Sequence, residues 1–269
     1  MFRLLLKHDW RSLRGILGLL CLICLGAGIL GGFALRSMIL LTEQEDPSAF
    51  QTVITMFTIM VSFVSMGITY AGTLIFCVWR FYKSRYSDEG YMTFTVPATV
   101  HQVLLSSLTA TLLALLVMAL TLALSICALM GIAFTAIPHF YSDAARELPL
   151  IWSEIRYAFR EESGPFLSMM LYSPVAMITE VIILMLSVTI GSVVARKLKV
   201  LASIGVYYGI NVVVSLANSV IMVLSGLLSS NSIDFYDQLF LYPTVLMLIL
   251  GVGGYFLMHR LASKKLDLP

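Results

Sequence analysis

Six long apolar runs constrain this chain more than any other feature of its sequence. Each run is long enough to cross a hydrocarbon core about 30 Å thick as a helix. Five contain no Asp, Glu, Lys or Arg, and the fourth contains only Glu180. Strands of a membrane β-barrel would be about 9–11 residues long and would alternate in polarity. We therefore predict an all-α, polytopic membrane protein whose six transmembrane helices cover Gly15–Leu35, Thr52–Trp79, Val103–Phe134, Phe166–Val194, Leu201–Leu228 and Leu239–Met258.

The overall composition supports this prediction. Apolar residues make up 59% of the chain and charged residues 12%, against about 45–50% and about 25% in an ordinary soluble domain. A soluble fold of this size would need many more polar side chains on its surface. Lipid removes that need, because it solvates apolar side chains. Membrane lipid is therefore an expected partner, and we expect no nucleic-acid partner.

The positions of the basic residues predict the orientation. Most of the 17 lysines and arginines lie before the first run or after the second, fourth and sixth runs. Basic loops stay in the cytoplasm, so both termini are expected there. The alternation holds through all six runs, which supports their number.

The first 14 residues are predicted to form an amphipathic helix in the membrane interface. Phe2, Leu6 and Trp10 can share one face, with Lys7 and Arg11 off it. The alternative is a cytoplasmic extension of the first span. Residues 15–269 then form the six-helix transmembrane domain. The first run exceeds the 7–15 residues of a cleavable signal core, so it is expected to be retained.

Residues 135–165 form the longest polar segment on the extracellular side. Ile151, Trp152, Ile155 and Phe159 have helical spacing, and Pro149 suits the first turn of such a helix. We expect this helix to rest on the outer leaflet or to cap the spans. A substrate gate is the second interpretation.

No catalytic motif is present in the sequence. It contains no G-x-x-x-x-G-K-[ST] loop, no H-E-x-x-H, no G-x-S-x-G and no His/Cys cluster. The four cysteines lie inside apolar runs and are interpreted as small apolar side chains. We expect no catalytic, cofactor-binding or metal-binding residues, and so no enzyme activity in this chain.

Glu180 is the single acidic residue within a predicted span. Such residues are costly in lipid and usually face protein or an aqueous cavity. Two interpretations stay open: contact with a substrate or proton, or a hydrogen bond to a neighbouring helix through Tyr207, Tyr208 or Asn211.

Small residues in the first span suggest a close helix contact. Gly28 and Gly32 have the G-x-x-x-G spacing that lets a partner helix approach closely. The fifth span also contains several small residues. We therefore expect the first and fifth spans to form a seam between two subunits.

The cytoplasmic segment between the second and third runs, residues 80–102, is too long for a simple turn. Ser87 can cap a short helix, in which Asp88 and Glu89 would occupy the first turn. Gly90 permits a break, and Thr95 with Pro97 can start the next helix.

This segment resembles one from the permease subunits of type 2 ATP-binding-cassette exporters. That family carries an acid-x-Gly followed by Thr-x-Pro, here Asp88-Glu89-Gly90 and Thr95-Val96-Pro97. The resemblance implies that residues 80–102 are a coupling segment that docks on a separate ATPase, through Ser87, Asp88, Glu89, Gly90, Tyr91, Thr95 and Pro97. ATP and magnesium would belong to that ATPase. Ser107 departs from the family, which often has lysine there, and the loop between the fifth and sixth spans is short.

The resemblance also implies a second permease chain, identical or related, and a bacterial plasma membrane of the Gram-positive kind. The predicted function is export of an amphiphilic substrate, such as an antimicrobial peptide, a drug or a lipid-like molecule, by alternating access. The alternatives are an ion-coupled secondary carrier and a membrane anchor or sensor that transports nothing.

Overall fold

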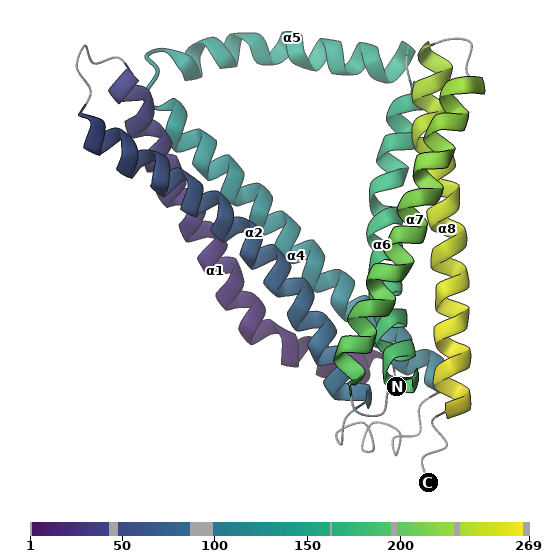
Figure 1. Ribbon diagram of the computed structural model, residues 1–269. Helices are drawn as coiled ribbons and strands as arrows, with labels where there is room; N and C mark the ends of the chain where they lie inside the picture. Colours follow the sequence, from purple (N-terminus) through teal and green to yellow (C-terminus); the bar gives the residue numbers. More distant parts are fainter. Residues whose placement is uncertain are drawn as a thin grey trace. The chain divides into compact units, whose positions relative to one another are not determined.

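The computed structural model describes residues 2–42, 48–86, 99–161, 163–194, 198–228 and 232–265. Within these ranges the chain is helical except for the turn at residues 135–139 and single residues at helix ends, and no strand occurs among them. The helices in chain order are α1 (Phe2–Thr42), α2 (Ala49–Tyr86), α4 (Val100–Phe134), α5 (Phe140–Glu161), α6 (Ser163–Val194), α7 (Lys199–Leu228) and α8 (Ser232–Lys265) (Figure 1).

The six predicted spans are confirmed as helices. Each predicted range lies inside one of α1, α2, α4, α6, α7 and α8. All six helices are long and apolar enough to cross a membrane. The chain is therefore an all-α membrane protein with six candidate spans among the residues described. The cytoplasmic position of the termini stays a prediction.

The N-terminal residues belong to the same helix as the first span. α1 continues from Phe2 to Thr42 without a break, so the predicted interfacial helix of residues 1–14 and the first span form one element. Ser12 donates a hydrogen bond to the carbonyl oxygen of Asp9 at 2.7 Å, inside this helix. The place of these turns at the membrane interface stays a prediction.

The helix expected in the polar segment 135–165 is present, but it starts earlier than predicted. α5 begins at Phe140, and Pro149 lies in its interior rather than in its first turn. The chain turns between α4 and α5 at His139, whose φ of 65° lies in the left-handed region. The first two turns of α5 contain Ser142, Asp143 and Arg146, so the apolar spacing there is weaker than it is after Pro149.

The chain divides into two compact units, which we describe separately. Unit 1 contains Met1–Leu5, Arg80–Thr109 and Glu154–Pro269, and unit 2 contains Leu6–Trp79 and Ala110–Ser153. The boundaries fall inside α1, α2, α4 and α5.

Unit 2 packs α1, α2 and α4 through small residues. Its apolar core includes Leu17, Cys24, Met66 and Leu129. Ser125 of α4 donates a hydrogen bond to the carbonyl oxygen of Cys24 in α1 at 2.7 Å, so these two backbones lie very close together.

The glycines of α1 make contacts within this chain, and their predicted place in a subunit seam stays a prediction. A Cβ atom at Gly28 would lie 2.5 Å from the carbonyl oxygen of Ser125, and one at Gly32 would lie 3.0 Å from the Cβ of Ile132. Both glycines are buried against α4. The G-x-x-x-G spacing correctly indicated a close helix partner, but that partner is α4 of the same chain.

Unit 1 is built around α6, which contacts both α7 and α8. From Val181 to Thr189 every residue of α6 except Leu184 is buried. The hydroxyl of Thr179 donates a hydrogen bond to the carbonyl oxygen of Met247 in α8 at 2.8 Å. Gly191, facing Ser203, and Gly251, facing Thr179, allow these close approaches. α6 contacts both other helices of the group formed by α6, α7 and α8 (Figure 1).

Candidate functional site

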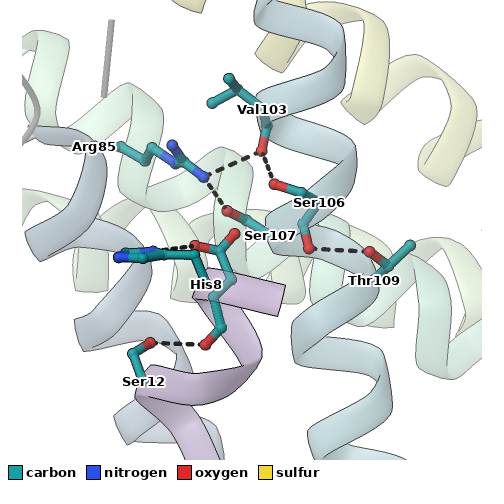
Figure 2. Close-up of polar contacts among 8 residues, drawn as sticks. His8, Ser12, Arg85, Val103, Ser106, Ser107 and Thr109 are labelled. Atoms are coloured by element: carbon teal, nitrogen blue, oxygen red, sulfur yellow. Dashed lines mark hydrogen bonds and ion pairs between the residues drawn. The ribbon is translucent and has the colours of Figure 1, made fainter. Parts of the chain in front are cut away.

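A buried arginine joins the last turn of α2 to the first turns of α4 in unit 1. Arg85 has only 4% of its surface exposed. One guanidinium nitrogen, Nη2, donates to the hydroxyl oxygen of Ser107 at 2.8 Å and to the carbonyl oxygen of Val103 at 3.3 Å (Figure 2). These bonds connect Arg85, near the start of the predicted coupling segment (residues 80–102), to two residues that follow its end.

The surroundings of Arg85 explain why α4 accepts this cation. Ser106 also donates to the carbonyl oxygen of Val103, at 2.9 Å, and Thr109 donates to that of Ser106 at 3.0 Å (Figure 2). A buried cation is costly unless hydrogen bonds surround it. A hydrogen bond to a charged group is worth about 1.5–3 kcal/mol. The start of α4 therefore provides two acceptors for Arg85, the carbonyl oxygen of Val103 and the hydroxyl of Ser107.

The residue after Arg85 connects the coupling segment to α6. The phenol of Tyr86 and the hydroxyl of Thr189 share a hydrogen bond of 2.8 Å. Phe81 packs edge-on against the Tyr86 ring, with 5.9 Å between the ring centroids. Thr189 is itself fully buried in α6. The end of α2 is therefore fixed to the central helix of unit 1.

A histidine at the other end of the coupling segment connects it to α8. His101 Nδ1 and the phenol oxygen of Tyr255 share a hydrogen bond of 2.6 Å. The ring of His259, one turn further along α8, lies 6.2 Å from the His101 ring, centroid to centroid. The start of α4 thus contacts α8 through aromatic side chains.

These contacts define the candidate site as the attachment of residues 80–102, the predicted coupling segment, made by Arg85, Tyr86, His101 and their partners. The predicted docking residues themselves, Ser87, Asp88, Glu89, Gly90, Tyr91, Thr95 and Pro97, lie outside the described residues. The structure describes the coupling segment at its two ends, residues 80–86 and 99–102.

Sequence reasoning missed the role of Arg85, because it counted this residue among the cytoplasmic charges that set the orientation. A signal was present in the spacing: Cys77 and Phe81 precede Arg85 at intervals of four residues, and all three are buried. Ser107, noted in the sequence for replacing a family lysine, is the hydroxyl that accepts from Arg85.

Glu180 has the neighbour that the structural interpretation named. The phenol of Tyr207 in α7 donates to Oε1 of Glu180 at 2.5 Å. Asn211, one turn away, donates from its side chain to the carbonyl oxygen of Tyr207 at 3.1 Å. Glu180 and Tyr207 are both half-buried. The hydrogen bond between α6 and α7 is confirmed, and a role for Glu180 in transport stays a prediction.

Among the residues that the structure describes, no group of three or more His, Cys, Asp or Glu side chains could hold a metal ion. The candidate site is therefore described by its hydrogen bonds and aromatic contacts alone.

No family model, no curated protein and no solved structure matches this chain. The fold defines the class of protein: a helical membrane protein with six candidate spans.

Proposed function

We propose that this chain is the membrane-spanning permease subunit of a type 2 ATP-binding-cassette exporter. A separate ATPase would bind the coupling segment, and a second permease chain would complete the pathway. The proposal rests on the acid-x-Gly and Thr-x-Pro pattern of residues 88–97, together with the anchored ends of that segment.

The single observation that carries the proposal is the double attachment of the coupling segment within unit 1. Tyr86 connects one end to Thr189 of α6, and His101 connects the other to Tyr255 of α8. A load applied between residues 87 and 98 would therefore reach two different membrane helices. A plain interhelical turn needs no such attachments.

Arg85 gives this arrangement its stiffness in the proposed mechanism. Its bonds to Val103 and Ser107 hold the two ends of the segment at a fixed spacing. The segment would then move as one body when the ATPase closes on ATP. Without Arg85, the ends would separate independently and less of the displacement would reach α6 and α8.

The proposed cargo is amphiphilic, such as an antimicrobial peptide, a drug or a lipid-like molecule. The chain contains 15 methionines and 15 phenylalanines, and these adaptable apolar side chains can accommodate irregular apolar cargo. The host would be a bacterium that exports such compounds across its plasma membrane.

Association with an ATPase tests the proposal directly. A photo-crosslinking residue at position 91 should capture a protein with a Walker-type nucleotide site, and the purified complex should hydrolyse ATP. The variants Asp88→Asn and Gly90→Ala should reduce both signals. Asp143→Asn, in the exposed first turn of α5, is the matched control and should change neither. A complex that retains full ATPase association in both coupling variants would refute the docking role.

A variant of Arg85 separates coupling from docking. Arg85→Ala should leave the ATPase bound and active but lower the amount of cargo exported per ATP. Arg85→Lys keeps the charge, but it cannot reproduce two directed bonds from one guanidinium nitrogen, so it should fall between alanine and wild type. Equal export per ATP in all three proteins would show that the anchorage has no part in coupling.

One observation favours the ion-coupled carrier as a second candidate: Glu180 lies half-buried between α6 and α7. In proteoliposomes, a carrier would lose cargo movement when the proton gradient is collapsed and would not respond to ATP. The exporter would need the ATPase and ATP, and Glu180→Gln would leave its ATP dependence intact. A non-transporting anchor would move no cargo under either condition.

A further inference from the structure

A single carboxylate lies near the middle of a candidate span in unit 1. Glu180 is central in the span Leu167–Val194. The lysines and arginines in the candidate spans of α6, α7 and α8 are Lys199 and Arg260, and each lies at or near an end of its span. Among the residues that the structure describes, none forms an ion pair with Glu180. A carboxylate at this depth is costly without a partner, so the site favours a ligand that brings positive charge.

The contact between α6 and α7 offers hydrogen-bond acceptors to such a ligand. An ionised carboxylate has about four lone-pair positions, and Tyr207 uses one of them at Oε1 of Glu180. At 100° per residue, Asn211 and Asn218 fall within about 40° of Tyr207 around α7. Val214 on the same face is buried. The side-chain oxygen of Asn218 is also buried and accepts no hydrogen bond from a described residue. Acceptors therefore outnumber donors along this face.

Two tyrosine rings lie beside the carboxylate. Tyr207 and Tyr208 pack edge to face, with 5.8 Å between the ring centroids and 71° between the ring planes. The face of a tyrosine ring attracts a cation placed within about 6 Å of its centroid. Because the Tyr207 phenol is bonded to Glu180, a cation beside the carboxylate also lies near these rings. The carboxylate and the rings both attract a cation, and both disfavour an anion.

We propose that the contact between α6 and α7 binds the ammonium head of an amphiphilic amine. This inference rests on the proposed exporter function and names the charge of its cargo. The ammonium N–H groups donate to the Glu180 carboxylate through charge-assisted hydrogen bonds. The alkyl chain lies against exposed apolar side chains of α7 near Tyr208, such as Val212 and Leu216. A quaternary ammonium fits less well, because it has no N–H donor for the acceptors.

Photoaffinity labelling of the chain alone tests this binding. The full-length chain in phosphatidylcholine vesicles would be irradiated with three dodecyl probes that carry the same diazirine and differ only in the head group: ammonium, trimethylammonium or sulfonate. Labelling of α2, in unit 2, would correct for the partition of each probe into lipid. The ammonium probe should label the peptides around Glu180 about tenfold more than the sulfonate probe, as expected for one charge-assisted hydrogen bond. The trimethylammonium probe should fall between them.

Variants assign the labelling to the carboxylate and the ring. Glu180→Gln keeps the shape of the side chain but removes its charge, so labelling by both cationic probes should fall to the level of the sulfonate probe. Tyr208→Leu removes an aromatic face and should lower labelling by both cationic probes. The matched control, Glu147→Gln, removes an exposed acid of α5 and should change nothing.

Equal labelling by the three probes in the wild type would overturn the proposal, and this comparison needs no variant to fold. Unchanged labelling in a folded Glu180→Gln protein would overturn it as well. Because no ATPase is present, either result would refute the charge of the cargo and leave the exporter proposal standing. Specific labelling by the ammonium probe in a chain that binds no ATPase would instead support the site and refute the exporter.

Discussion

The substitution Gly28→Ala provides the sharpest test of the packing in unit 2. The new Cβ atom would lie 2.5 Å from the carbonyl oxygen of Ser125 and 3.0 Å from its carbonyl carbon. Both are backbone atoms of α4, so no side-chain rotation relieves the contact, and α1 must move away from α4.

The expected magnitude follows from two opposing effects. Overpacking of a tight contact costs about 1–3 kcal/mol, and the contact at Gly28 involves backbone atoms, which places it in the upper part of that range. Alanine is favoured over glycine inside a helix by about 1 kcal/mol. The net loss of stability should be about 1–2 kcal/mol, which corresponds to a fall in melting temperature of about 2–8 °C.

Gly26→Ala is the matched control on the same helix. A Cβ atom at Gly26 would meet no atom within 4 Å, so only the helix preference operates and the melting temperature should stay the same or rise. A thiol-reactive fluorescent maleimide can follow unfolding in detergent, because Cys24 is fully buried in α1. If Gly28→Ala melted at or above the wild type, the described contact between α1 and α4 would be wrong.

The same variant separates packing within the chain from a subunit seam. If Gly28 contacts α4 of its own chain, Gly28→Ala should lower the melting temperature without dissociating oligomers at low temperature. Loss of an oligomer in size-exclusion chromatography before any unfolding would support the predicted subunit seam instead.

Three further predictions concern unit 1. Gly191→Ala should lower the free energy of unfolding by about 1–3 kcal/mol, and with it the melting temperature, because its Cβ would lie 2.6 Å from a Cα atom of α7. Gly205→Ala, with open space around it, should leave the melting temperature unchanged or higher. Tyr207→Phe removes the donor to the Glu180 carboxylate in α6 and should lower the free energy of unfolding by about 1 kcal/mol. Tyr208→Phe, at a side chain that is 64% exposed, should leave it unchanged. Equal melting temperatures of the two variants would contradict the hydrogen bond. Thr179→Val removes the hydroxyl that donates to α8 and should cost about 1 kcal/mol; an unchanged melting curve would show that the bond adds nothing to stability.

The sequence was sufficient to predict the membrane helices, because long charge-free runs have few other stable forms. For Glu180 the sequence left two interpretations open, and the hydrogen bond to a neighbouring helix, named as one of them, is present between Glu180 and Tyr207. The start of α5 was placed too late because Pro149 is a common first-turn residue, and the helix tolerates it in the interior instead.

The partners of small and polar residues could not be read from spacing. The spacing of Gly28 and Gly32 predicts a close helix contact. It does not predict which helix lies opposite, and the structure shows that Ser125 and Ile132 of α4 face them. Arg85 resembled every other basic residue at the end of a span. Its burial depends on two acceptors in α4, the carbonyl oxygen of Val103 and the hydroxyl of Ser107, which are 18 and 22 residues away in the chain.

The hydrogen bond between Tyr86 and Thr189 also has a consequence for biosynthesis, because its two residues are 103 positions apart. At about 5–20 residues per second, a ribosome adds Thr189 roughly 5–20 s after Tyr86. Arg85 can meet Ser107 early, while Tyr86 must wait for most of α6 to be translated. A nascent chain truncated before residue 189 would contain both ends of the segment around residues 87–98 but lack the α6 contact, and membrane quality-control proteases would meet it in that unfinished state.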